Sequence, residues 1–195
     1  MKPTQIAVTT AIIAAAIILT AVLSTASLNA AATGGGADQA QIARGKYLVD
    51  IMGCHDCHTP MKMGPQGPQW DLDRALSGHP ENLVMPPAPV LPPGPWIGTA
   101  AATFTAWSGP WGTSFTANLT PDKETGLGDW TVDQFIATMQ TGKDRGKGRP
   151  VLPPMPVQNL AQLSDEDIRA LFAYLQTLKP IKNRVPQPID PPDSK

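Results

Sequence analysis

Cys54-His55-Asp56-Cys57-His58 is the stretch that decides the fold of this chain. Two thiols separated by two residues, with a histidine directly after the second, have the spacing that covalent haem attachment requires. Each thiol can add across one vinyl group of the porphyrin, and His58 then lies under the ring as an iron ligand. The sequence holds 2 cysteines, both in this motif. We therefore predict one haem c, bound through Cys54 and Cys57.

Two other interpretations of the cysteine pair each need a feature that the sequence lacks. A thioredoxin-like redox pair is expected beside a βαβ pattern, which the sequence does not show. A structural zinc site needs two further cysteines or paired histidines. The other histidines, His55 and His79, are poorly placed to complete one.

The N-terminus carries the export signal that haem attachment outside the cytoplasm requires. Lys2 precedes an uncharged run over residues 6–23, and Ala30-Ala31-Ala32 is a small-residue cleavage pattern. A run of about 18 residues can also span a bilayer as a helix. Residues 1–32 are thus predicted to be a signal peptide, which the cleavage pattern favours, or an N-terminal membrane anchor. Both predict the periplasm or the outer face of the cytoplasmic membrane.

Composition bounds what remains. With 15 basic and 16 acidic residues the formal net charge is −1, which excludes a typical nucleic-acid binder. We expect a linker over 33–39, one domain over 40–179 and a loose Pro-rich tail over 180–195. Ten prolines fall between Pro60 and Pro95 and predict a long extended loop there, since proline is excluded from helix interiors and central strands.

Three helices are predicted, over residues 39–52, 130–140 and 164–178. Thr131 and Gln134 have capping-box spacing, and Gly142 follows the end of that helix. Ser164 is the predicted cap of the last helix, which ends before Pro180.

With the haem motif, a leading helix and a closing helix in this order, the chain resembles the class I cytochrome c fold over residues 40–178. The resemblance implies an all-α fold in which the N- and C-terminal helices cross beside the haem, with the Pro/Gly-rich loop as an insertion. It also implies that Gly45 and Tyr47 meet Leu171 and Tyr174 at the crossing.

Four further segments resemble a bacterial subgroup that includes cytochromes accepting electrons from periplasmic dehydrogenases. They are residues 109–112, 117–122, 125–130 and 148–156. The resemblance implies protein redox partners: a donor dehydrogenase or complex, and an acceptor oxidase or other cytochrome.

Met155 is the predicted sixth iron ligand. It stands between Pro154 and Pro156, whose rings stiffen the backbone, and it precedes the last helix as the family's distal methionine does. A thioether is a soft, neutral donor that favours ferrous iron and raises the potential. Met85, His79 or an open position are the alternatives.

Residues 143–149, named here the basic segment, carry four Lys or Arg side chains just before Met155. They are either a solvated turn or a surface that steers an acidic partner, with Arg149 or a lysine against a haem propionate. Trp107, Trp111 and Trp130 could also donate to propionates, or fill the core.

The sequence therefore predicts a periplasmic electron carrier with His58 and Met155 as iron ligands, and no catalytic residues. One alternative is a fixed cytochrome subunit of a membrane dehydrogenase or respiratory complex. Another is a haem peroxidase or sensor, which would need an open distal site.

Overall fold

The computed structural model of this protein describes residues 38–191. The predicted signal peptide or anchor over residues 1–32 lies outside the described residues. By its internal contacts the chain divides into residues 1–40 and residues 41–195. Apart from residues 38–40 of the first helix, the elements named below belong to the second unit. Between residues 38 and 191 no helix is long and apolar enough to cross a membrane.

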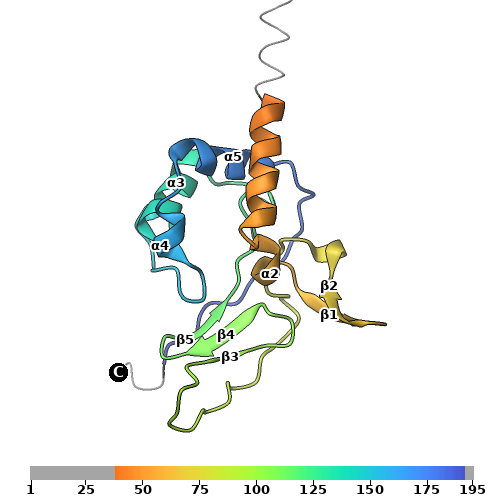
Figure 1. Cartoon of the computed structure of the whole chain (residues 1–195), viewed down its shortest axis with the longest axis vertical. Helices are drawn as coiled ribbons and strands as arrows, with labels where there is room; N and C mark the ends of the chain where they lie inside the picture. Colours follow the sequence, from red (N-terminus) through yellow and green to blue (C-terminus); the bar gives the residue numbers. More distant parts are fainter. Residues whose placement is uncertain (1–37, 192–195) are drawn as a thin grey trace, which may run out of the picture. The chain divides into compact units, whose positions relative to one another are not determined.

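Helices form where the sequence predicts the three long ones. The helical elements are residues 38–51, α2 (Cys54–His58), α3 (Val132–Thr141), α4 (Val157–Leu160) and α5 (Asp165–Leu175), with 3₁₀ turns η1 (Leu72–Arg74) and η2 (Asp144–Gly146). α5 ends three residues before the predicted Leu178, and the short α4 was not predicted. The helices lie together in the upper part of Figure 1.

Local capping chemistry explains the boundaries of α3 and α5. The Thr131 hydroxyl accepts from the Gln134 amide at 3.2 Å, and the Gln134 side chain accepts from the Thr131 amide at 3.1 Å. This reciprocal pair satisfies two amides at the start of α3. Gly142 ends the helix with φ 64°, a conformation that glycine adopts without strain. Ser164 caps α5 by accepting from Asp167.

The helix of residues 38–51 crosses α5 at very short range. A Cβ atom on Gly45 would overlap the Ala170 carbonyl oxygen and lie 2.8 Å from the Tyr174 Cβ. Arg44 bonds Asp167 across the same crossing at 2.8 Å. The predicted contact of Gly45 with Tyr174 is therefore confirmed. Tyr47, in contrast, is 53% exposed, and its ring lies against Arg44.

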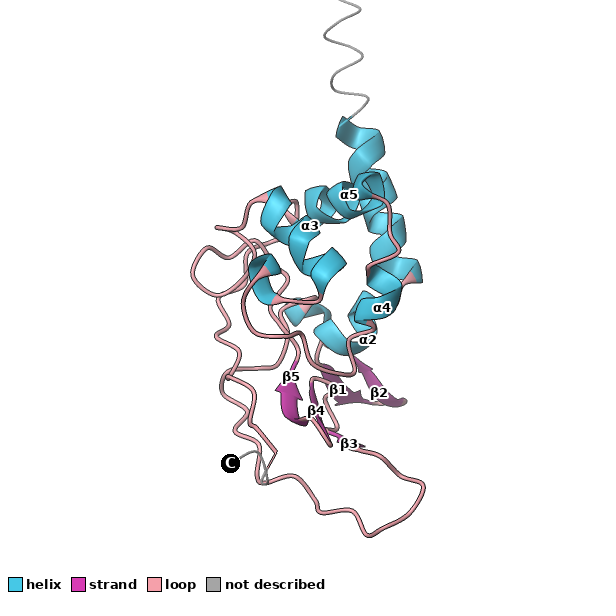
Figure 2. Ribbon diagram, turned by 90° about the vertical axis from the view of Figure 1, so that its left-hand side faces the viewer, coloured by secondary structure: helices cyan, strands magenta, loops and turns pink. Residues whose placement is uncertain are grey.

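Five short strands make the all-α prediction wrong. One hairpin pairs β1 (Met61–Gly64) with β2 (Gly67–Trp70), and a three-stranded antiparallel sheet joins β3 (Thr99–Ala100), β4 (Ala106–Gly109) and β5 (Gly112–Phe115). Figure 2 shows the strands gathered at one end of the helices. The paired segment Gly109-Pro110-Trp111-Gly112 is a turn signal in the sequence that could have indicated the second hairpin.

The proline-rich stretch is only partly the extended loop that was expected. Pro68 lies within β2, opposite Met63. A two-stranded hairpin leaves one edge of each strand unpaired, so a residue without an N–H is tolerated there. Residues 80–98 form no helix or strand, and Val84, Val90 and Trp96 are largely exposed on them.

The C-terminal segment is not loose over its described part. Asn183 is buried, and its side-chain amide donates to the Ser77 and His79 carbonyl oxygens. Ile189 pairs with Thr113 beside β5. Proline prevented these residues from forming a helix, but it did not prevent them from packing.

The apolar core is one small cluster of buried side chains, most of them from the helices. Its buried members are Leu48, Val49, Leu76, Leu127, Phe135, Ile136, Met139, Leu160, Ile168, Leu171 and Leu175. α3 packs against both α4 and α5.

We expect Gly45→Ala to destabilise the fold, because the added methyl must push the helix of residues 38–51 away from α5. The free energy of unfolding should fall by about 3 kcal/mol, at the upper end of overpacking costs. Gly94→Ala is the matched control, since a Cβ there meets only the Pro92 carbonyl oxygen at 3.8 Å. Denaturant unfolding measures both. Equal stability of the two variants would contradict the close crossing.

Candidate haem site

The two cysteines lie one helical turn apart on α2. Gly53 precedes this helix with φ 67°, and the left-handed residue turns the chain between the helix of residues 38–51 and α2. Residues three apart share one face of a helix. Cys54 and Cys57 are both free thiols and partly buried.

Burial sets the ionisation of both thiols. It raises the pKa of Cys54 to about 11 and also raises that of Cys57. A disulfide oxidoreductase needs the opposite, a thiol whose pKa is lowered so that the thiolate forms at neutral pH. The environment of this pair therefore disfavours the redox-pair interpretation. In residues 38–191 no group of three or more metal-binding side chains is present for a protein-only metal site.

His58 is held as a neutral imidazole. The side chain is buried, and Nδ1 lies 2.8 Å from the Ala117 carbonyl oxygen. A carbonyl only accepts, so Nδ1 carries the proton and Nε2 keeps its lone pair. Burial also lowers the pKa of His58, which favours the same uncharged form. A metal-binding histidine is commonly oriented by such a bond from its second nitrogen.

His79 is placed differently from His58. It is fully buried, its Nδ1 lies 3.0 Å from the Thr105 hydroxyl, and its Nε2 lies 2.9 Å from the Leu83 carbonyl oxygen. Both ring nitrogens have protein partners, so neither is free to bind iron. These bonds disfavour His79 as the alternative sixth ligand.

Met155 lies in the loop that leads into α4. The Ser114 hydroxyl of β5 donates to the Pro153 carbonyl oxygen at 2.6 Å and ties this loop to the sheet. The Val157 amide donates to the Met155 carbonyl oxygen at 2.9 Å. Met155 and Cys54, about 100 positions apart in the sequence, both pack against the same apolar cluster.

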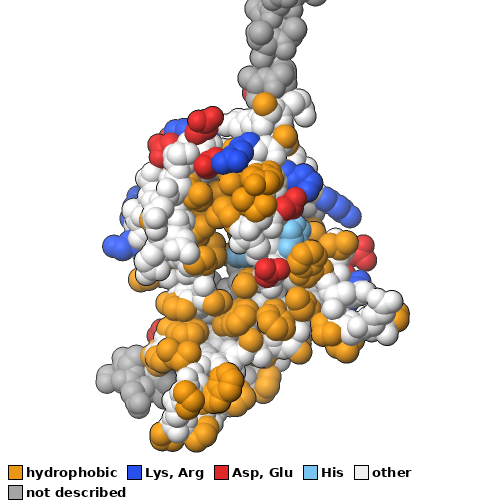
Figure 3. Space-filling view, in the orientation of Figure 1, with side chains coloured by type: hydrophobic (Ala, Val, Ile, Leu, Met, Phe, Trp, Pro, Cys, Tyr) orange, Lys and Arg blue, Asp and Glu red, His pale blue; other side chains and the backbone are white. Residues whose placement is uncertain are grey.

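The molecular surface is hollowed beside α2. Figure 3 shows this hollow on the side of α2 that faces α3 and α4. A concave region with apolar walls and a few polar groups is the usual form of a cofactor site.

One buried donor in the described part of the chain lacks a partner. The Trp111 Nε1–H group is buried and makes no hydrogen bond, whereas Trp107 donates to the Phe104 carbonyl oxygen at 3.1 Å. A buried N–H normally has an acceptor, and a haem propionate would supply one. Cys54, Cys57 and His58 together fit a covalently bound haem.

The basic segment is anchored to α3 by one of its residues. Arg145 lies over the Trp130 ring at 4.8 Å and donates to Gln134 at 3.3 Å. Lys143 and Lys147 are exposed, and neither forms an ion pair within residues 38–191. The Val151 amide donates to the Gly142 carbonyl oxygen at 2.8 Å, which joins the segment to the chain leading to Met155.

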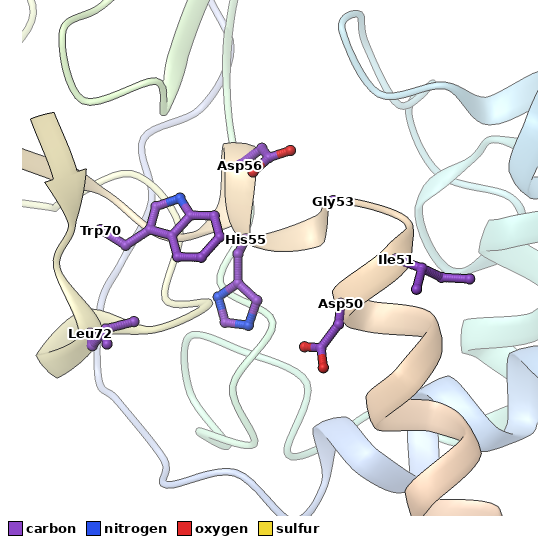
Figure 4. Close-up of a pocket in the computed structure, with 7 residues that line it drawn as sticks. All are labelled: Asp50, Ile51, Gly53, His55, Asp56, Trp70 and Leu72. Atoms are coloured by element: carbon purple, nitrogen blue, oxygen red, sulfur yellow. The ribbon is translucent and has the colours of Figure 1, made fainter.

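A second hollow lies against the haem motif. A cavity of about 360 Å³ opens next to α2, and Figure 4 shows the His55 imidazole and the Trp70 indole side by side in it. Their ring centroids are 5.5 Å apart. The remaining lining residues are Asp50, Ile51, Gly53, Asp56 and Leu72. The His55 Nδ1 lies 2.8 Å from the Thr59 hydroxyl, so His55, one of the two residues between the cysteines, braces the motif.

The sequence did not indicate two residues that position the site. Ala117 contributes only its carbonyl oxygen, which any residue could supply, and Ser114 acts through a bond to a distant backbone carbonyl. Neither has a chemical signature in the sequence. Trp111 is one of the three tryptophans that the sequence named as candidate donors. Only the structure shows that its N–H group is the one that is buried without a partner.

Comparison with known proteins identifies the class. The family model for cytochrome c matches residues 42–179. The chain is 32% identical over 153 residues to the cytochrome c subunit of a quinone alcohol dehydrogenase from Gluconobacter oxydans, covering 77% of this chain and 24% of the relative. It is 31% identical over 138 residues to the gluconate 2-dehydrogenase cytochrome c subunit of Pantoea cypripedii, covering 71% of this chain and 23% of the relative.

A third relative is the fructose dehydrogenase cytochrome subunit of Gluconobacter japonicus, 29% identical over 146 residues, with 74% of this chain and 23% of the relative covered. The chain thus spans about a quarter of the length of these curated relatives. It belongs to the cytochrome c family, whose members bind haem c covalently and transfer electrons.

Single cysteine variants test the attachment. Cys54→Ala or Cys57→Ala leaves at most one thioether bond, because the chain has no other cysteine. We expect part of the haem to become extractable into acidified organic solvent, while the wild type keeps all of it on the polypeptide. Haem that extracts freely from the denatured wild type would contradict covalent attachment.

Proposed function

We propose that this chain carries single electrons between protein partners through one haem c, with His58 and Met155 as its axial iron ligands. The observation that carries the proposal is the neutral, buried His58, which lies directly after the cysteine pair and has its Nδ1–H directed to Ala117. The same arrangement leaves Nε2 as the free donor atom.

In electron transfer the side chains of this protein would hold the iron and fix the position of its ligands. When bound, a haem c with histidine and methionine ligands takes up and releases one electron at the iron without any covalent bond being made or broken. His58 and Met155 keep the coordination unchanged, so little reorganisation accompanies each electron. The loop that carries Met155 is tethered by the Ser114 hydroxyl and would hold the methionine in place against a bound haem.

The relatives favour a place in a dehydrogenase system. Those compared above are cytochrome subunits of alcohol, gluconate and fructose dehydrogenases. We therefore propose that this chain accepts electrons from a dehydrogenase as one of its subunits, which was the alternative in the sequence prediction, ahead of a freely diffusing carrier. Co-purification of an untagged dehydrogenase chain in fixed ratio supports a subunit, and an isolated monohaem protein supports a carrier.

The proposed location is the periplasm or the outer face of the cytoplasmic membrane. Covalent haem attachment outside the cytoplasm and the apolar run over residues 6–23 support it. Protein sequencing of the N-terminus would decide between cleavage after Ala32 and a retained anchor.

Substitution of Met155 tests the sixth ligand. Met155→His should keep the iron six-coordinate but replace sulfur by a donor that favours ferric iron. The weak sulfur-to-iron absorption near the red end of the spectrum should vanish, and the potential should fall by an amount on the order of a few hundred millivolts. Met85→Leu is the matched control and should change neither property. If Met155→Leu keeps the sulfur absorption and the native potential, another residue is the ligand.

Charge reversal in the basic segment tests partner recognition. Lys143→Glu with Lys147→Glu should slow electron exchange with an acidic partner by roughly tenfold at low salt. Since ions screen exposed charges beyond about 10 Å at 0.1 M, the difference should shrink as salt is added.

Lys123→Glu with Lys179→Glu is the control for net charge, because these exposed lysines lie outside the basic segment. It should leave the rate nearly unchanged. Stopped-flow measurements at several salt concentrations give the rates, and equal slowing by both double variants would show that net charge, not the segment, matters.

A further inference from the structure

Two loops hold His58, and each uses one main-chain group. The Ala117 carbonyl oxygen accepts from Nδ1 at 2.8 Å. The Gly78 amide donates to the His58 main-chain carbonyl oxygen, also at 2.8 Å. The side chain and the backbone of the histidine are thus fixed from two segments that are about 40 residues apart in the sequence.

The two loops are also bonded to each other. The His79 amide donates to the Thr116 carbonyl oxygen at 3.0 Å, and the Leu119 amide donates to the Leu76 carbonyl oxygen at 2.9 Å. Residues 76–79 and 116–119 therefore form one support on which His58 rests. Because the loops are joined, a shift of either one would disturb both hydrogen bonds that hold His58.

A short C-terminal segment closes this support from the other side. Residues 181–184, named here the C-terminal strap, follow α5 and run across both loops. Asn118 donates to the Ile181 carbonyl oxygen at 2.8 Å, and Asn118 is the neighbour of Ala117. The strap thereby reaches the loop that binds the His58 side chain.

Asn183 holds the other loop with its whole side-chain amide. Its Nδ2 donates to the Ser77 carbonyl oxygen at 2.7 Å and to the His79 carbonyl oxygen at 2.8 Å, on either side of Gly78. Its Oδ1 accepts from the Glu81 amide at 2.8 Å. The side chain is buried, so these bonds do not compete with bulk water.

We propose that Asn183 is a positioning residue for the proximal histidine, which acts through the 76–79 and 116–119 loops to set the strength of the His58 to Ala117 hydrogen bond. This inference rests on the proposed role of His58 as iron ligand. A strong bond from Nδ1 makes the imidazole a better donor to the metal and favours ferric iron. The C-terminal strap would therefore tune the potential of a bound haem through these two loops.

The test compares Asn183→Ala with Gln176→Ala in the haem-loaded full chain. Gln176 also donates an amide bond from beyond α5, to the Leu127 carbonyl oxygen at 3.0 Å, but it touches neither loop. We expect Asn183→Ala to raise the midpoint potential and to make the His58 Nδ1–H exchange with solvent roughly tenfold faster by NMR. Gln176→Ala should leave both at the wild-type values, and the sulfur absorption should persist in both variants.

Equal losses of stability in the two variants, with potential and Nδ1–H exchange unchanged in both, would overturn the proposal and leave the strap a purely structural element. If Asn183→Ala does not take up haem, the same two measurements are made on Asn183→Gln. The extra methylene of glutamine misplaces the bonds to Ser77, His79 and Glu81 but keeps the amide. A wild-type spectrum without histidine ligation would instead refute the proposed function, independently of Asn183.

Discussion

The hydrogen bond from His58 Nδ1 to the Ala117 carbonyl oxygen is the constraint on which the site depends. A free imidazole rotates and exchanges its proton between two nitrogens, and only one of these states offers Nε2 to a metal in a fixed direction. The bond selects that state before any cofactor is bound. It also requires the loop around Ala117 to approach α2, and the C-terminal segment is bonded to that loop through Asn118.

This requirement explains why so much of the described structure is polar and irregular. The apolar cluster lies between the helices, whereas the support of His58 consists of buried backbone groups that have to be paired. A buried carbonyl or amide without a partner costs about as much as a lost hydrogen bond. Asn118, Thr120 and Asn183 supply those partners where no helix or strand can.

Sequence reasoning succeeded where a local pattern determines a local structure. The capping box at Thr131, the cap at Ser164 and the small residue at Gly45 each act over one helical turn or one contact, and the structure has all three. It failed where the proline content of a segment was used to predict structure that depends on hydrogen bonds to distant segments. Prolines excluded helices between Pro60 and Pro95, but they did not exclude a hairpin with free edges, and they did not leave the C-terminal segment loose.

The sequence by itself determined the haem motif, the histidine that follows it, the long helices and their caps, because these depend on residue type and on spacing within a few positions. Only the tertiary structure decided which carbonyl orients His58, which tryptophan keeps an unpaired donor, and that Asn183 braces the loop of residues 76–79. The acceptors of these bonds are backbone carbonyl oxygens, which every residue carries. They lie 39 to 106 positions from their side-chain donors, and how the chain packs, rather than any pattern along it, decides the pairing.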